Sequence, residues 1–258
     1  MMELDDAYAN AAYIPGADAY PDKWAQAAAA FRDTTLCELD LAYGEGPRQR
    51  YDLFHPQRLS KGLVVFVHGG YWLRFDKSFW SHLAAGPLAQ GWSVAMPSYD
   101  LCPDVRITDI RREIMAAIAA MSLRVPGPIR LSGHSAGGQL VAMASVATPG
   151  ARWQDRLVQT VAISPVADLA PLMRTSMNAD LRLDEQQIVN ESPVHQPVPK
   201  SPVTVWVGAD ERPVFLEQAE ALAQAWQCAK VVDAGKHHFN VIEDLASPDS
   251  PLTAAVLG

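Results

Sequence analysis

The segment that most constrains the fold of this chain is Gly133-His134-Ser135-Ala136-Gly137. A short apolar strand is predicted before it, over Ile129–Ser132, and a helix after it, over Ala136–Ala147, where Ala, Met, Leu and Val recur at helical spacing. A serine between two glycines at such a turn is typical of a nucleophile elbow, because glycines permit a turn tight enough to raise the hydroxyl above the sheet edge. The N-terminus of the helix adds N–H groups that favour negative charge nearby. We therefore predict that Ser135 is a nucleophile.

Strands and helices are predicted to alternate along most of the chain. The expected strands are Leu36–Ala42, Gln49–Phe54, Leu63–Val67, Ser93–Pro97, Ile129–Ser132, Val158–Ser164, Val203–Val207 and Lys230–Val232. The expected helices are Phe79–Gln90, Thr108–Leu123, Ala136–Ala147 and Val214–Trp226. Continuous apolar strands that alternate with helices indicate a mostly parallel sheet covered on both faces. The predicted fold class is α/β: an α/β-hydrolase layout with an eight-stranded, mostly parallel sheet, an opening hairpin, and the elbow after the fifth strand.

The length of 258 residues is normal for one large α/β domain, so residues 1–258 are expected to form a single domain. Residues 1–33 contain several aromatic side chains and an alanine-rich stretch, and we expect a helical N-terminal arm there. Residues 168–199 interrupt the alternation of strands and helices and are a candidate for a small helical cap insertion. Parallel sheets of this kind place their active residues beyond the carboxyl ends of the strands.

Composition excludes several classes of partner. The net charge is −8 without a basic cluster, which argues against nucleic acid and anionic membranes as partners. No run approaches the ~18 apolar residues of a membrane span, and the acidic start does not resemble a signal peptide. The three cysteines (Cys37, Cys102 and Cys228) are isolated, which suits a reducing compartment, so the cytoplasm is the expected location. The oligomeric state stays open, with a homodimer as one option.

A glycine pair follows the third expected strand directly, in His68-Gly69-Gly70-Tyr71-Trp72. Acyl transfer builds negative charge on an oxygen, and N–H groups fixed in advance stabilise that charge by on the order of 3 kcal/mol each. An H-G-G-x motif supplies such donors together with the residue after a nucleophilic serine. We therefore predict an oxyanion hole made by the N–H groups of Gly70, Tyr71 and Ala136. The alternative is an ordinary glycine turn at a strand end.

A nucleophilic serine needs a base, and only two of the seven histidines, His237 and His238, lie in the loop after the last expected strand. His238 is preferred because the apolar residues that follow it would anchor it, and His237 is the alternative. The remaining histidines are expected to be structural or exposed: His55, His82 and His195 have no catalytic neighbour, while His68 and His134 brace the two glycine motifs.

The acid that orients the base is expected at the end of the seventh strand, in Gly208-Ala209-Asp210-Glu211. From position alone, both Asp210 and Glu211 are available.

No cofactor is expected. A metal site is not expected either, because the adjacent His237 and His238 lack the H-x-x-x-H spacing and further ligands of a metal centre.

These motifs resemble the hormone-sensitive-lipase-like branch of the α/β-hydrolases, and within it the kynurenine formamidase (arylformamidase) group. The resemblance covers nearly the whole chain, and its most specific parts are the H-G-G-x-W motif at His68 and the ending H-F-x-x-I-E at His238. In that group the acid lies three residues after the strand-ending glycine and four before a phenylalanine. Counted from Gly208 and Phe215, this position is Glu211, where the group often has aspartate, so Asp210 stays possible. The resemblance also supports His238.

The resemblance implies a cofactor-free serine hydrolase in which Ser135 attacks, His238 accepts its proton and Glu211 orients the imidazole. The implied substrate is N-formyl-L-kynurenine, a small molecule with a small acyl group and an aromatic leaving group. Tyr71, Trp72 and Trp80 are expected near the mouth of the site or, as the alternative, in the packed interior. A carboxylesterase or thioesterase for short acyl chains is the rival of the same class. A binding module on an inactive scaffold is the rival of another class.

Overall fold

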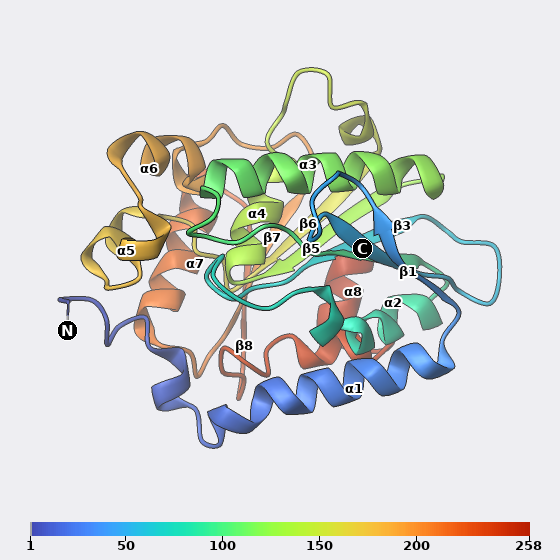
Figure 1. Cartoon of the computed structure of the whole chain (residues 1–258), viewed down its shortest axis with the longest axis horizontal. Coiled ribbons are helices and arrows are strands. Elements are labelled where there is room, and N and C mark those ends of the chain that lie inside the picture. The colour runs from blue at the N-terminus through green and yellow to red at the C-terminus, as the bar shows by residue number, and fades with distance from the viewer. Residues whose placement is uncertain (1) are drawn as a thin grey trace.

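The computed structural model describes residues 2–258 and places eight strands in one sheet, in the order β1-β2-β4-β3-β5-β6-β7-β8 (Figure 1). The strands are β1 Cys37–Ala42, β2 Arg50–Phe54, β3 Leu63–Val67, β4 Ser93–Pro97, β5 Ile129–His134, β6 Leu157–Ile163, β7 Val203–Gly208 and β8 Ala229–Asp233. β2 is antiparallel to both β1 and β4, and every other neighbouring pair is parallel. The predicted fold class is confirmed.

Helices cover both faces of this sheet. They are α1 Tyr20–Thr34, α2 Ala85–Ala89, α3 Ile107–Arg124, α4 Ala136–Ser145, α5 Asn178–Leu181, α6 Glu185–Glu191, α7 Pro213–Trp226 and α8 Pro251–Leu257. In Figure 1, α3 runs along one side of the sheet, and α1, α2 and α8 lie on the other. Because β3, β5, β6, β7 and β8 are parallel, their carboxyl ends lie at the same edge of the sheet.

Strand β3 shows why the sheet is so apolar. Leu63, Val65 and Val67 pack into the cluster that includes α3 and α4, whereas Val64 and Phe66 pack into the cluster that includes α1 and α8. Because successive side chains of a strand point to opposite faces, a strand covered on both faces must be hydrophobic at every position. All five residues are buried.

The helix predicted over Phe79–Gln90 is wrong in its first half. The chain forms two short 3₁₀ turns, at Lys77–Phe79 and Ser81–Ala84, before α2 begins at Ala85. A continuous α-helix from Phe79 would place Pro87 in its interior, where the ring clashes with the carbonyl four residues earlier. With α2 starting at Ala85, Pro87 lies in the first turn, where it is tolerated.

The two segments that flank the alternating region are helical. Residues 10–34 form 3₁₀ turns at Asn10–Tyr13 and Ala17–Ala19 and then α1. Residues 170–195 form a 3₁₀ turn at Ala170–Arg174, then α5, α6 and a further 3₁₀ turn at Pro193–His195. That they are the arm and the cap of a single domain stays a prediction.

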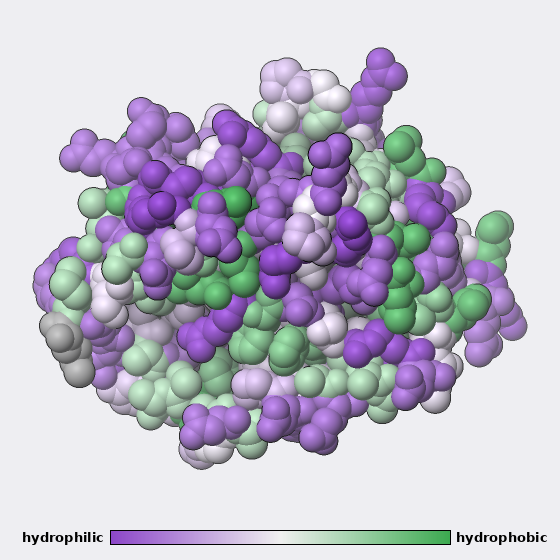
Figure 2. Space-filling view, viewed as in Figure 1, coloured by the Kyte–Doolittle hydropathy of each residue, from purple (hydrophilic) through white to green (hydrophobic). Residues whose placement is uncertain are grey.

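Hydrophilic residues cover most of the face seen in Figure 2, with hydrophobic residues scattered between them. Among residues 2–258, no helix is both long and apolar enough to cross a membrane.

Candidate active site

Ser135 lies at a strained turn between β5 and α4, with φ 57° and ψ −116°. Its glycine neighbours make this turn possible. A Cβ on Gly133 would lie 2.3 Å from the carbonyl oxygen of Gly137, and a Cβ on Gly137 would lie 2.0 Å from that of Val67 in β3. Both contacts are with backbone, which cannot yield as a flexible side chain does. Strained backbone of this kind is often found at functional sites, where the surrounding structure holds it.

The loop after β3 comes close to the elbow. A Cβ on Gly69 would lie 3.0 Å from the Cβ of Ser135. The next three residues all have positive φ: Gly70 at 117°, Tyr71 at 55° and Trp72 at 60°. Within residues 2–258, the N–H groups of Gly70 and Tyr71 donate to no protein acceptor, and Ala136 begins α4, so its N–H has no carbonyl four residues back within the helix. The three N–H groups predicted for the oxyanion hole are therefore left available.

A buried carboxylate and an imidazole meet beside this loop. Nδ1 of His238 lies 2.6 Å from Oε2 of Glu211, and both residues are buried. The other carboxylate oxygen, Oε1, accepts hydrogen bonds from the N–H of Gly208 at 2.9 Å and from the hydroxyl of Ser164 at 2.5 Å. Because Glu211 occupies Nδ1, the Nε2 atom of His238 is the ring nitrogen left for a reacting group.

Gly208 is needed for the loops of the acid and the histidine to meet. A Cβ at this position would lie 2.2 Å from the carbonyl oxygen of Lys236, two residues before His238. The same carbonyl accepts a hydrogen bond from the N–H of Asp210 at 2.9 Å. The side chain of Asp210 is exposed, so of the two adjacent acids only Glu211 reaches His238.

The alternative histidine, His237, faces another part of the molecule. Its Nε2 lies 3.2 Å from the hydroxyl of Tyr20 in α1, and its Nδ1 accepts from the N–H groups of Phe239 and Asn240. Both ring nitrogens of His237 are thus engaged away from Glu211.

The two histidines of the glycine motifs are buried. Burial lowers the pKa of His68 to about 4, and its ring stacks on Tyr99 at a centroid distance of 4.4 Å. Burial and, secondly, the charge of His238 hold the pKa of His134 well below its usual value, and the rings of His134 and His238 lie 4.6 Å apart. Both are therefore neutral near pH 7.

Ser135 and His238 line the same cavity, which has a volume of about 590 Å³. Its walls are largely apolar and aromatic, and it also contains Gly70, Tyr71 and Trp80. Trp72 does not line it: the side chain is fully buried and its Nε1 donates to Gln139 at 3.3 Å. Of the three aromatic residues expected at the mouth or in the packed interior, Tyr71 and Trp80 line the cavity while also packing in the core, and Trp72 lies only in the packed interior.

Several residues of the site were missed by the sequence analysis. Ser164, whose hydroxyl bonds to Glu211, follows β6 directly and has φ 46°; a serine after an apolar strand was the available signal. The N-terminal segment supplies much of the cavity wall, including Tyr8, Asn10 and Trp24. The Nδ2 group of Asn10 donates to the hydroxyl of Tyr71 at 3.3 Å, and that hydroxyl donates to the carbonyl of Tyr8. Nothing in the local pattern of residues 1–33 indicates this role.

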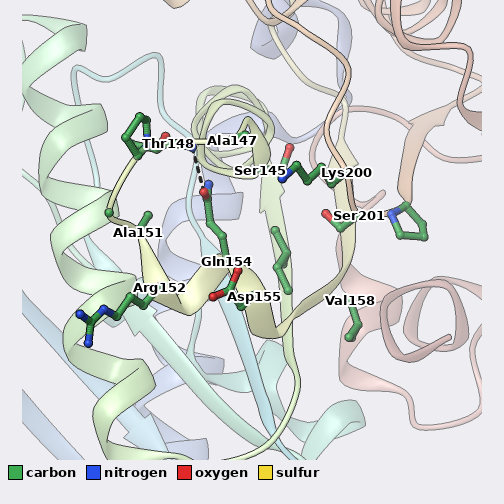
Figure 3. Close-up of a pocket in the computed structure, with 14 residues that line it drawn as sticks. Ser145, Ala147, Thr148, Ala151, Arg152, Gln154, Asp155, Val158, Lys200 and Ser201 are labelled. Atoms are coloured by element: carbon green, nitrogen blue, oxygen red, sulfur yellow. Dashed lines mark hydrogen bonds between the residues drawn. The ribbon is translucent and has the colours of Figure 1, made fainter.

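A second hollow, of about 820 Å³, lies near the amino ends of β6 and β7 (Figure 3). It is lined by residues such as Arg152, Asp155 and Lys200, and it contains none of the predicted site residues. In the described part of the chain, no group of three or more His, Cys, Asp or Glu side chains is arranged to hold a metal ion.

Comparison with known proteins places the chain among hydrolases. The model of a family described by its α/β-hydrolase fold matches residues 64–238, which include Ser135, Glu211 and His238. The chain is 29% identical to a kynurenine formamidase from Salmo salar over 240 residues, or 85% of this chain and 80% of that protein. It is 27% identical to a kynurenine formamidase from Danio rerio over 245 residues, or 88% and 83%.

Solved structures agree on the fold. The crystal structure of a proposed thioesterase from a Silicibacter species is 51% identical, covers 100% of both chains and superposes with a TM-score of 0.98. Esterase B from Lactobacillus rhamnosis, inhibited by a phosphonate, superposes with a TM-score of 0.69 at 17% identity, over 93% of this chain and 91% of that one. From its sequence match and its fold together, the chain belongs to the α/β-hydrolase family and is a hydrolase related to the kynurenine formamidases.

Proposed function

We propose that this protein is a serine hydrolase in which Ser135, His238 and Glu211 form the catalytic triad. The observation that carries the proposal is the buried Glu211–His238 pair, whose histidine lines one cavity together with a serine on a strained elbow. In such a unit the carboxylate fixes the tautomer of the imidazole and stabilises the imidazolium that forms during the reaction.

The reaction runs in two steps. Nε2 of His238 accepts the proton of Ser135 as Oγ attacks the carbonyl carbon, and the N–H groups of Gly70, Tyr71 and Ala136 stabilise the resulting oxyanion. The imidazolium then gives its proton to the leaving group, and the bond between the carbonyl carbon and the leaving group breaks. A water molecule attacks the acyl-enzyme in the same way and restores the serine.

The proposed substrate is an N-formyl aryl amide such as N-formylkynurenine, which yields formate and an aromatic amine. Two features support it: the kynurenine formamidases that the chain resembles over most of its length, and a cavity walled by Trp24, Phe75 and Trp80. A volume of about 590 Å³ lies within the ~300–1,000 Å³ range of small-molecule sites. The rings offer a flat apolar surface to an aromatic leaving group.

A carboxylesterase or thioesterase for short acyl chains is the second candidate. It is favoured by the 51% identical solved structure, which is described as a proposed thioesterase. The triad and the oxyanion hole would serve either substrate, so only the leaving-group side of the cavity separates the two candidates.

The experiment compares kcat/KM for N-formyl-L-kynurenine, p-nitrophenyl acetate and a short acyl thioester, with wild type and Ser135→Ala. We expect the formamide to be the best of the three, and Ser135→Ala to lose several orders of magnitude in kcat while keeping its fold. A preference for the ester or thioester, abolished in Ser135→Ala, would move the assignment to the second candidate. Near-normal turnover by folded Ser135→Ala would end the serine-hydrolase proposal.

A further inference from the structure

Two charged side chains in the wall of the active-site cavity have no partner. Arg74 and Asp18 both line the cavity and are exposed, and within residues 2–258 neither forms a hydrogen bond or ion pair through its side chain. Asp5 also lines the cavity, but its carboxylate is not free, because it accepts hydrogen bonds from the backbone N–H groups of Met2 and Ser176.

The free charges come from different walls and have opposite signs. Asp18 lies in the 3₁₀ turn Ala17–Ala19 of the N-terminal segment, whereas Arg74 lies in the loop that follows β3. The two walls meet where Phe75 packs edge-on against Trp24, at a centroid distance of 6.1 Å. Arg74 is near Tyr71, one of the proposed oxyanion donors. Burial raises the pKa of Tyr71, and the positive charge of Arg74 opposes that rise.

Other arginines near the cavity are not free. Arg48 donates to the carbonyls of Tyr99 and Phe75, and Arg212 pairs with Asp6 and covers the ring of Tyr13. Arg74 is the one Lys or Arg among the residues that line the cavity in the described chain. An unpaired guanidinium at the edge of an aromatic cavity is suited to a carboxylate, for which it offers two parallel donors.

We propose that the cavity mouth binds the α-amino acid group of the substrate, with Arg74 on the carboxylate and Asp18 on the ammonium. The inference rests on the proposed function, and it defines the substrate class as an N-formyl aryl amide whose amine carries a zwitterionic tail. An ester or thioester without such a tail leaves both charges unsatisfied. Arg74 and Asp18 are thus specificity-determining residues that bind the leaving group away from the scissile bond.

The test uses four formamides: N-formyl-L-kynurenine, its methyl ester without the carboxylate, its analogue without the α-amino group, and 2-formamidoacetophenone without either. For Arg74→Met we expect kcat/KM to fall about five- to tenfold with the two carboxylate-bearing substrates, mostly through KM, and to change less than about twofold with the others. Asp18→Asn should show the complementary pattern, with losses confined to the two substrates that carry the ammonium. Added salt should weaken both effects, since the charges are exposed.

Arg152→Met and Asp155→Asn are the matched controls. Both side chains are exposed, make no polar side-chain contact in the described chain, and lie in the second hollow (Figure 3). They change the net charge by the same amounts, so they should leave the substrate pattern unchanged.

Two outcomes would overturn the inference. If wild type hydrolyses all four formamides but Arg74→Met and Asp18→Asn lower the four rates equally, or not at all, the zwitterion site is wrong while the proposed function stands. If wild type hydrolyses none of the formamides yet still turns over p-nitrophenyl acetate through Ser135, the proposed function fails first and the inference fails with it.

Discussion

The elbow around Ser135 and the N-terminal segment that walls the cavity are held in place by different forces. At the elbow, backbone packs directly against backbone: the glycines of β5 and α4 lie where a Cβ would strike the carbonyls of Gly137 and Val67. All ten residues of α4 are buried. The N-terminal segment is instead held largely through side chains, by the surface ion pairs Arg174–Glu3 and Arg212–Asp6 and by the buried rings of Tyr8 and Trp24.

We therefore expect the elbow to matter most for catalysis and the N-terminal segment to matter most for the choice of substrate. Backbone contacts cannot relax, so they hold the proposed nucleophile and the proposed oxyanion donors in one arrangement. Exposed side-chain pairs contribute little each and are screened by salt. We therefore expect changes at the sheet edge to abolish catalysis or folding, and changes to the surface ion pairs of the N-terminal segment to alter stability only slightly.

The largest effect is expected at the histidines. His238→Ala should be as inactive as Ser135→Ala, roughly 10⁶-fold below wild type in kcat, because nucleophile and base act as one unit. His237→Ala should keep at least about a tenth of the activity, since its ring bonds to Tyr20 and not to Glu211. Steady-state kinetics of both variants in one assay are the measurement. An inactive His237→Ala beside an active His238→Ala would place the base one residue earlier.

The second-largest loss of activity is expected from substitution of the proposed catalytic acid. Glu211→Gln should keep the fold and lose about three to four orders of magnitude in kcat, because an amide favours the wrong tautomer of His238. Asp210→Asn is the matched control, and its exposed side chain should make it nearly neutral. A crippled Asp210→Asn beside an active Glu211→Gln would transfer the role to Asp210. Mild losses in both would mean that the two acids substitute for each other.

Glycine substitutions in the two regions should lower the unfolding free energy by different amounts. Gly137→Ala should cost about 3 kcal/mol of unfolding free energy or more, because its Cβ would lie 2.0 Å from a backbone oxygen. Gly16→Ala, in the N-terminal segment, should cost only about 1 kcal/mol, which is the strain of a positive φ. Its φ is 70°, but nothing lies within 4 Å of the new Cβ. Urea unfolding measures both, and equal losses would show that the two regions are equally rigid.

The smallest effect is expected from the ion pairs of the N-terminal segment. Glu3→Gln and Asp6→Asn should each lower the unfolding free energy by less than about 1 kcal/mol, because both carboxylates are exposed. Hydrogen exchange of the first residues should quicken while that of α4 stays unchanged. A loss of several kcal/mol, or faster exchange in α4, would show that these two ion pairs do more than attach the start of the segment at the surface.

Elements whose pattern is local could be predicted from the amino-acid sequence alone. Apolar runs identified the eight strands within a few residues, and the glycines flanking Ser135 identified the elbow, because both signals come from the geometry of a short stretch of backbone. The predicted helix over Phe79–Gln90 failed where a local rule, the position of Pro87, outweighed apolar spacing.

Which residues meet across the chain depends instead on how the whole chain packs. Asp210 and Glu211 are neighbours in the sequence, yet one is exposed and the other is buried against His238, because the turn after β7 points their side chains in different directions. The position of Ser164 after a strand likewise did not tell which residue it would bond to, and nothing in the sequence indicated that Arg74 and Asp18 would line one cavity. Such contacts join residues far apart in the chain, and their positions follow from how helices and loops pack on the sheet, which no local pattern records.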